Sequence, residues 1–177
     1  MLTKLIILRG NSGSGKTTTA HLLRQALSPK TTMLVSQDLI RLEILNVKDF
    51  PENPSVQLIP KICKFGNNRY DYVILEGILD REKYQTMLSD LLEFFDNNTL
   101  VYYFDISFSE TLKRNDQHAA DHRFSKELLE KWWLDKDFLA VSSEHQLAED
   151  LTQKEIIQQI LIDLRKNSKF LPHHSPK

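Results

Sequence analysis

The segment Gly10-Asn11-Ser12-Gly13-Ser14-Gly15-Lys16-Thr17 is the most informative part of this 177-residue chain. It fills every fixed position of the phosphate-binding loop G-x-x-x-x-G-K-[ST], the P-loop. The apolar run at residues 5–8 precedes it, as a buried strand would, and Ala20, Leu23 and Leu27 follow at helical spacing. Strand, glycine loop and helix therefore come in the order that the motif requires. A Gly/Ser-rich turn that merely resembles the motif would not explain both flanks.

The chemistry follows from the backbone of this loop. Glycines let successive N–H groups point into one concavity, and the helix that follows adds its positive end beneath bound phosphates. Lys16 should reach the β- and γ-phosphates, and Thr17 should ligate Mg²⁺ through its hydroxyl group. The residues expected to bind a nucleoside triphosphate are Gly10, Asn11, Ser12, Gly13, Ser14, Gly15, Lys16, Thr17 and Thr18.

Length and composition indicate one domain in a reducing compartment. With 41% hydrophobic residues, 177 residues can bury one sizeable core. A net charge of −1 does not indicate nucleic acid or an anionic membrane surface as a partner. Cys63 is the only cysteine, which excludes an internal disulfide, and no apolar run approaches membrane-spanning length. We expect a cytoplasmic protein with a domain at residues 1–166 and a flexible tail at 167–177, and leave its oligomeric state open.

Strand and helix patterns alternate along the chain. Strands are expected at residues 3–9, 32–36, 70–76, 100–106 and 145–147. Asn53-Pro54 is typical of a helix start, Gly66 of a helix end, and Thr152-Gln153-Lys154-Glu155 of a capping box. The apolar stripes within residues 84–95 and 156–164 indicate helices that pack on the core. This alternation predicts an α/β fold whose parallel sheet is covered on both faces, with the ligand at the carboxyl ends of the strands.

Asp38 and Arg41 follow the second expected strand. The Asp38 carboxylate could accept the proton of a substrate hydroxyl that attacks the γ-phosphate, and Arg41 would share its helical face. Alternatively, Asp38 stabilises a helix dipole and Arg41 is a surface charge.

Glu76 ends the apolar strand Tyr72-Val73-Ile74-Leu75. An acid at the tip of a buried strand is costly unless it is paired or close to a cation, which fits a carboxylate that acts on Mg²⁺ directly or through water. Only one acid lies here, and this favours phosphoryl transfer to a substrate over hydrolysis.

A basic segment, residues 113–123, follows the fourth expected strand. Phosphoryl transfer creates charge that must be neutralised, so a mobile lid over about residues 113–125 could close on the phosphates and exclude water. Arg114 could lie against the base, whereas a solvated helix face is the alternative for the whole segment. His118 and His122 have i, i+4 spacing, but no further ligand joins them, so we expect no zinc site.

These motifs together resemble a small P-loop kinase. In pattern the chain is similar to the polynucleotide-kinase, zeta-toxin and chloramphenicol-phosphotransferase group, whose bacterial members are often labelled uridine-kinase-like. The similarity runs from Thr3 to about Leu164. It includes Asp38-x-x-Arg41, Leu75-Glu76-Gly77 and Trp132-Trp133-Leu134-x-Lys136-Asp137-Phe138-Leu139.

The resemblance implies a three-layer α/β/α fold with a five-stranded parallel sheet in the order 2-3-1-4-5. It also implies MgATP as donor, Asp38 as base and Arg41 as a substrate or phosphate ligand. Adenylate-kinase-like lids carry Arg-x-x-x-Arg, whereas this chain has Arg114-x-x-x-His118. We expect Arg123 to supply the missing charge.

We therefore expect an ATP-dependent kinase that transfers the γ-phosphoryl group to a hydroxyl of a small-molecule or nucleoside-like acceptor, which the sequence does not identify. A non-catalytic or switch-type nucleotide-binding protein is the main alternative, although Asn46-Val47-Lys48-Asp49 does not supply the Asn-Lys-x-Asp motif of a guanine-specific switch. A polynucleotide 5′-kinase, which the charge balance disfavours, and a toxin-like kinase of an activated sugar also stay open.

Overall fold

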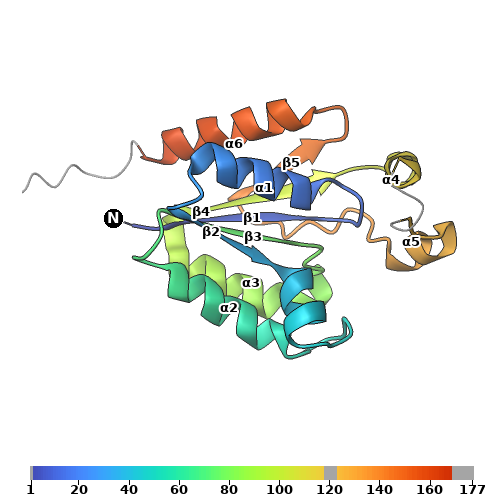
Figure 1. The fold of residues 1–177 in the computed structure, drawn as a ribbon, viewed down its shortest axis with the longest axis horizontal. Coiled ribbons are helices and arrows are strands. Elements are labelled where there is room, and N and C mark those ends of the chain that lie inside the picture. The colour runs from blue at the N-terminus through green and yellow to red at the C-terminus, as the bar shows by residue number, and fades with distance from the viewer. Residues whose placement is uncertain (1, 118–122, 169–177) are drawn as a thin grey trace, which may run out of the picture.

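Five parallel strands form one sheet in the computed structural model, which describes residues 2–117 and 123–168 (Figure 1). Their order is β2-β3-β1-β4-β5. The strands are β1 (Lys4–Gly10), β2 (Thr32–Ser36), β3 (Tyr72–Gly77), β4 (Thr99–Asp105) and β5 (Glu144–Ala148). The five expected strands and the order implied by the resemblance are confirmed.

Helices cover both faces of the sheet. Helices α1 (Lys16–Leu27) and α6 (Gln153–Ser168) lie on one face, and α2 (Ser55–Gly66) and α3 (Arg81–Phe95) lie on the other (Figure 1). Helices α4 (Phe108–Asp116) and α5 (Lys126–Trp132) lie beyond the carboxyl ends of the strands. The short π-helix η1 (Leu39–Ile44) follows β2, and the 3₁₀ turn η2 (Asp96–Asn98) precedes β4. The molecule thus has the three-layer α/β/α P-loop fold.

Strand β1 is the centre of the core. Successive side chains of a strand point to opposite faces, so Leu5 and Ile7 pack among residues of α2 and α3. Ile6 and Leu8 pack among residues of α1 and α6. Because both faces are covered, the whole strand is buried, which explains its continuous apolar sequence.

Two expected helix starts are confirmed by their side-chain hydrogen bonds. Asn53 Oδ1 accepts from the backbone N–H of Ser55 at 3.1 Å. In the capping box, Glu155 Oε2 accepts from Thr152 N at 2.8 Å and Thr152 Oγ1 accepts from Glu155 N at 3.3 Å. Helix α6 then continues to Ser168, past the expected domain limit at residue 166.

Some sequence predictions fall outside the described residues. His118 and His122 are among them, as is most of the expected tail, residues 169–177. Within residues 2–117 and 123–168, every helix is too short or too polar to cross a membrane.

Candidate active site

The P-loop connects β1 to α1 at the carboxyl edge of the sheet. Gly13 and Gly15 have φ angles of +72° and +98°, which L side chains rarely adopt. A Cβ atom at Gly15 would also lie only 2.9 Å from Gln153 Nε2. The loop therefore needs glycine at these positions to turn its N–H groups toward one concavity at the start of α1, the arrangement that binds phosphate.

Lys16 is held by the loop that contains it. Its Nζ donates to the Asn11 carbonyl oxygen at 2.7 Å and to Ser14 Oγ at 3.1 Å, and the residue is only 6% exposed. Burial lowers the pKa of Lys16 to about 8, although the charges of Glu76 and Asp38 partly oppose the shift. Both carboxylates thus lie within electrostatic reach of the lysine.

The lowered pKa of Lys16 predicts a pH dependence of stability. Below pH 8 the lysine is charged in both states; between pH 8 and 10.5 the folded protein releases the proton while the unfolded chain keeps it. The free energy of unfolding of the wild-type protein should therefore rise across this window, relative to that of Lys16→Met, by up to about 3 kcal/mol. Urea denaturation of both proteins at pH 7 and pH 10 measures this difference, and a constant difference would contradict the assignment.

Thr17 and Glu76 form a pair beside the lysine. The Thr17 hydroxyl donates to Glu76 Oε2 at 3.0 Å, and Glu76 is 4% exposed at the end of β3. In the part of the chain that the structure describes, no group of three or more His, Cys, Asp or Glu residues could hold a metal ion. Mg²⁺ in nucleotide sites needs only one or two protein oxygens, because phosphates and water complete its shell. The Thr17 and Glu76 oxygens fit that requirement.

Asp38 immediately precedes η1, with its side chain 61% exposed. It makes no side-chain hydrogen bond to η1, but it lies at the start of η1, so the helix-dipole alternative stays open. Arg41 lies three residues further on, and its Nη2 contacts Asp38 Oδ1 at 3.0 Å while Nη1 donates to the Val47 carbonyl oxygen at 3.2 Å. The shared helical face is thus observed. The Asp38 carboxylate is accessible to an acceptor, while the Arg41 guanidinium is engaged within its own segment.

Arg114 joins three parts of the site. Its Nη1 donates to the Ser14 carbonyl oxygen at 3.1 Å and its Nη2 to the Glu149 carbonyl oxygen at 3.1 Å. Its Nε donates to Glu110 at 2.9 Å within α4. The basic start of the expected lid therefore belongs to a helix attached to the P-loop. Arg123 is exposed, and it is the first described residue after position 117.

Two clefts meet at the P-loop. The first, here the P-loop pocket, has a volume of about 370 Å³ and is lined by Ser12, Gly13, Gly15, Lys16, Thr17, Thr18, Thr111, Asn115, Phe124 and Leu129. The second, here the α6 pocket, measures about 420 Å³, and Arg114, Gln117, Leu151 and Gln153 are among its lining residues. Both are lined by Gly13, Gly15 and Thr18, so both clefts border the P-loop.

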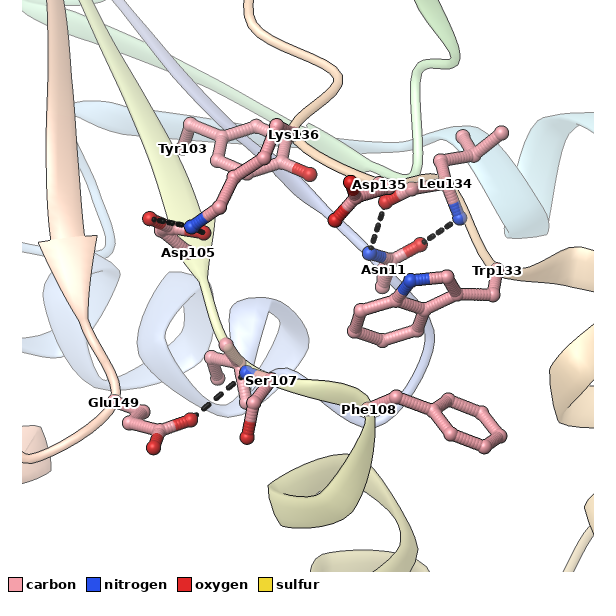
Figure 2. A pocket seen from close by; sticks show the side chains of 11 residues that line it. Asn11, Tyr103, Asp105, Ser107, Phe108, Trp133, Leu134, Asp135, Lys136 and Glu149 are labelled. Carbon is pink, nitrogen blue, oxygen red and sulfur yellow. Dashed lines mark hydrogen bonds and ion pairs between the residues drawn. The ribbon is translucent and has the colours of Figure 1, made fainter.

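A third cleft, of about 400 Å³, is shown in Figure 2. Asn11, Phe108, Trp133 and Lys136 are among the residues that line it. The Asn11 side chain faces this cleft and binds the backbone of Leu134, while the Asn11 carbonyl group binds Lys16. Any contact of Asn11 with a nucleotide would therefore come from its backbone.

Sequence reasoning missed Arg9, although its position offered a signal. Arg9 is fully buried near the end of β1, and it contacts Asp137 at 2.6 Å, Glu144 at 3.2 Å and the Leu79 carbonyl oxygen at 2.9 Å. A charge inside an apolar strand requires such partners. Burial raises the pKa of Asp137, and Arg9 opposes the shift. Through Asp137, this network holds the segment that follows α5 against the end of β1.

Comparisons with known proteins identify the class of fold. No family model and no curated protein matches the sequence. A gluconokinase from Sinorhizobium meliloti 1021 is similar in structure, with a TM-score of 0.70, 16% identity, and coverage of 96% of this chain and 98% of that chain. The APS kinase of Mycobacterium tuberculosis in complex with AMPPNP and APS gives a TM-score of 0.68, 15% identity, and coverage of 93% and 98%. Shikimate kinase from Aquifex aeolicus vf5 gives a TM-score of 0.54 and 20% identity, with coverage of 94% of this chain and 99% of that chain.

These structures share the fold of P-loop kinases with this chain. At such identities the likeness concerns the fold alone. The narrower resemblance to the polynucleotide-kinase, zeta-toxin and chloramphenicol-phosphotransferase group is not established by these comparisons.

Proposed function

We propose that this protein is an ATP-dependent kinase that transfers the γ-phosphoryl group to a hydroxyl of a small-molecule or nucleoside-like acceptor. One observation carries the proposal: the Thr17 hydroxyl joins the P-loop that contains Lys16 to Glu76 at 3.0 Å, and Asp38 follows β2, the strand that pairs with the strand of Glu76. A phosphate ligand, a metal-binding carboxylate and an accessible base are the groups that this reaction requires. The similar solved structures include three kinases, one of them with bound AMPPNP.

The two clefts at the P-loop suggest how ATP would lie. The P-loop pocket would take the triphosphate, and the α6 pocket would take the base, with Arg114 beside it. Thr17 and Glu76 would hold Mg²⁺, directly or through water. When bound, Mg²⁺ neutralises charge on the phosphates and so favours transfer.

The residues divide the work of transfer between them. The acceptor oxygen forms a bond to the γ-phosphorus while the bond from that phosphorus to the bridging oxygen breaks, and ADP leaves. Asp38 receives the proton of the acceptor hydroxyl. Lys16 and Arg123 stabilise the charge that develops on the phosphoryl oxygens. Arg41 orients Asp38 or the acceptor, because it already contacts the carboxylate.

A screen of phosphate acceptors with MgATP tests the proposed function. The panel contains gluconate, APS, shikimate, nucleosides, sugars, a nucleotide sugar and an oligonucleotide with a free 5′-hydroxyl. ADP release above the rate without acceptor identifies the acceptor class. MgATP binding without stimulation by any class would favour the non-catalytic alternative, and stimulation by the oligonucleotide would favour a polynucleotide kinase.

Glu76→Gln is expected to raise the Mg²⁺ concentration for half-maximal ADP release by about 10- to 100-fold. Glutamine still accepts the Thr17 hydrogen bond but removes the negative charge that would face the metal. The measurement is a Mg²⁺ titration at saturating ATP. Glu93→Gln, at an exposed position of α3, provides the matched control. An unchanged Mg²⁺ requirement in Glu76→Gln would show that Glu76 does not act on the metal.

A further inference from the structure

We propose that Asn11 and Asn115 are positioning residues that hold residues 124–134, the α5 segment, against the P-loop pocket. The inference rests on the proposed nucleotide binding at the P-loop. It assigns a role to two amide side chains that lie at opposite ends of that segment.

Asn115 holds the beginning of the α5 segment. It lies in the last turn of α4 and is 7% exposed. Its Nδ2 donates to the Phe124 carbonyl oxygen at 2.9 Å, and its Oδ1 accepts from the Phe124 backbone N–H at 3.0 Å. One side chain thus satisfies both backbone groups of a single residue, as a neighbouring strand would.

Asn11 holds the end of the segment in the same way. It is 4% exposed, its Nδ2 donates to the Leu134 carbonyl oxygen at 2.8 Å, and its Oδ1 accepts from the Leu134 backbone N–H at 2.9 Å (Figure 2). The Asn11 carbonyl oxygen accepts the hydrogen bond from Lys16. Asn11 therefore binds the α5 segment through its side chain and Lys16 through its backbone carbonyl group.

The α5 segment depends on these clamps because it has few other attachments. Within α5 the only buried residue is Leu129. One aromatic edge contact adds to the clamps, because Phe108 of α4 packs on Trp133 with ring centroids 5.1 Å apart. Phe124 packs on Trp132 at 5.3 Å, a contact within the segment itself. Backbone groups at Phe124 and Leu134, which lie outside helices and strands, need partners, and the asparagine amides supply them.

The clamps place two side chains of the segment at the P-loop pocket. Phe124 and Leu129 line that pocket together with Asn115 itself, and Arg123 directly precedes Phe124. A segment in this position would shield the phosphates from water. Loosening either clamp should therefore weaken nucleotide binding even where the P-loop is intact.

The two tryptophans of the chain make the segment easy to follow, because Trp132 and Trp133 both lie near its end. Asn11→Ala and Asn115→Ala are each expected to weaken Mg·AMP-PNP binding about tenfold by calorimetry and to reduce the change in indole emission on binding. Asn115→Gln keeps an amide oxygen and an amide NH₂ and should recover part of the affinity for Mg·AMP-PNP. Ser125→Ala is the control, because it removes the cap of α5 at Leu128 N and the side-chain contact with Glu127 and leaves both clamps.

The outcomes separate this inference from the proposed function. Wild-type affinity and emission change in both Asn→Ala variants would overturn the clamps. Equally weak Mg·AMP-PNP binding in Ser125→Ala would also overturn the clamps, because any loosening of α5 would then be enough to weaken nucleotide binding. If the wild-type protein does not bind Mg·AMP-PNP, the proposed function fails. The clamps are then tested by the indole emission of the protein without nucleotide. The Asn→Ala variants should shift this emission, and Ser125→Ala should leave it unchanged.

Discussion

Lys16→Met is expected to weaken MgATP binding about 100-fold. Charge-assisted hydrogen bonds contribute about 1.5–3 kcal/mol each, and Lys16 should make such bonds to the β- and γ-phosphates. Methionine has a similar length and no charge, so it fills the same space while it removes this attraction and the hydrogen bonds of Lys16 to Asn11 and Ser14. Isothermal calorimetry with MgATP measures the change.

The control for this variant is Lys61→Met, at an exposed position of α2. It makes the same chemical change away from the P-loop and should leave MgATP affinity unchanged. Thermal unfolding of both variants checks that the fold persists. Wild-type affinity in Lys16→Met would remove the basis of the proposed nucleotide site.

The main architecture could be predicted from the sequence because its signals are local. Residues 5–8 and 72–75 are continuous apolar runs, and both are strands buried between two helical layers. The β1–P-loop–α1 order follows from a motif whose glycines have a direct conformational reason. Even the short strand β5 was predicted, and the structure only extends it to Glu144–Ala148. The sheet order needed the resemblance, because strand patterns alone do not show which strands are neighbours.

The attachments around the site could not be predicted, because their partners are far apart in the chain. Arg9 contacts Asp137 and Glu144, and neither spacing nor periodicity selects those two acids from the others. Asn115 and Phe124 lie closer together, yet an asparagine in the last turn of a helix is usually read as a surface residue. The burial of Asn115 and its paired hydrogen bonds become visible only in three dimensions.

For Asp38 and Arg41, too, the sequence predicted one feature and left others undetermined. Their spacing predicted a shared helical face, and the structure places them on one, although the turn is a π-helix. Spacing did not reveal that Arg41 also binds the Val47 carbonyl group, nor that Asp38 is exposed while Glu76 is buried. This difference in exposure supports a division of roles, with the buried acid toward the metal and the exposed acid toward the acceptor.

Asp38→Asn is expected to lower turnover with the acceptor found in the screen by roughly 10²–10⁴-fold, the usual contribution of a general base. Asparagine keeps the size of the side chain and can still accept from Arg41, but it cannot take the acceptor proton. MgATP affinity should survive, because the Asp38 side chain is exposed and makes no hydrogen bond to the P-loop among the described contacts.

Asp90→Asn is the matched control for this prediction, since Asp90 is also an exposed aspartate, 50% exposed and paired with Lys64 on the α2–α3 layer. It should leave both turnover and MgATP affinity unchanged. Steady-state ADP release at saturating MgATP, with calorimetry of MgATP binding, separates the two effects in each variant. A fall in turnover confined to Asp38→Asn assigns the base. Near-normal turnover in Asp38→Asn would mean that this carboxylate is not the base, and that it positions Arg41 or stabilises the dipole of η1 instead.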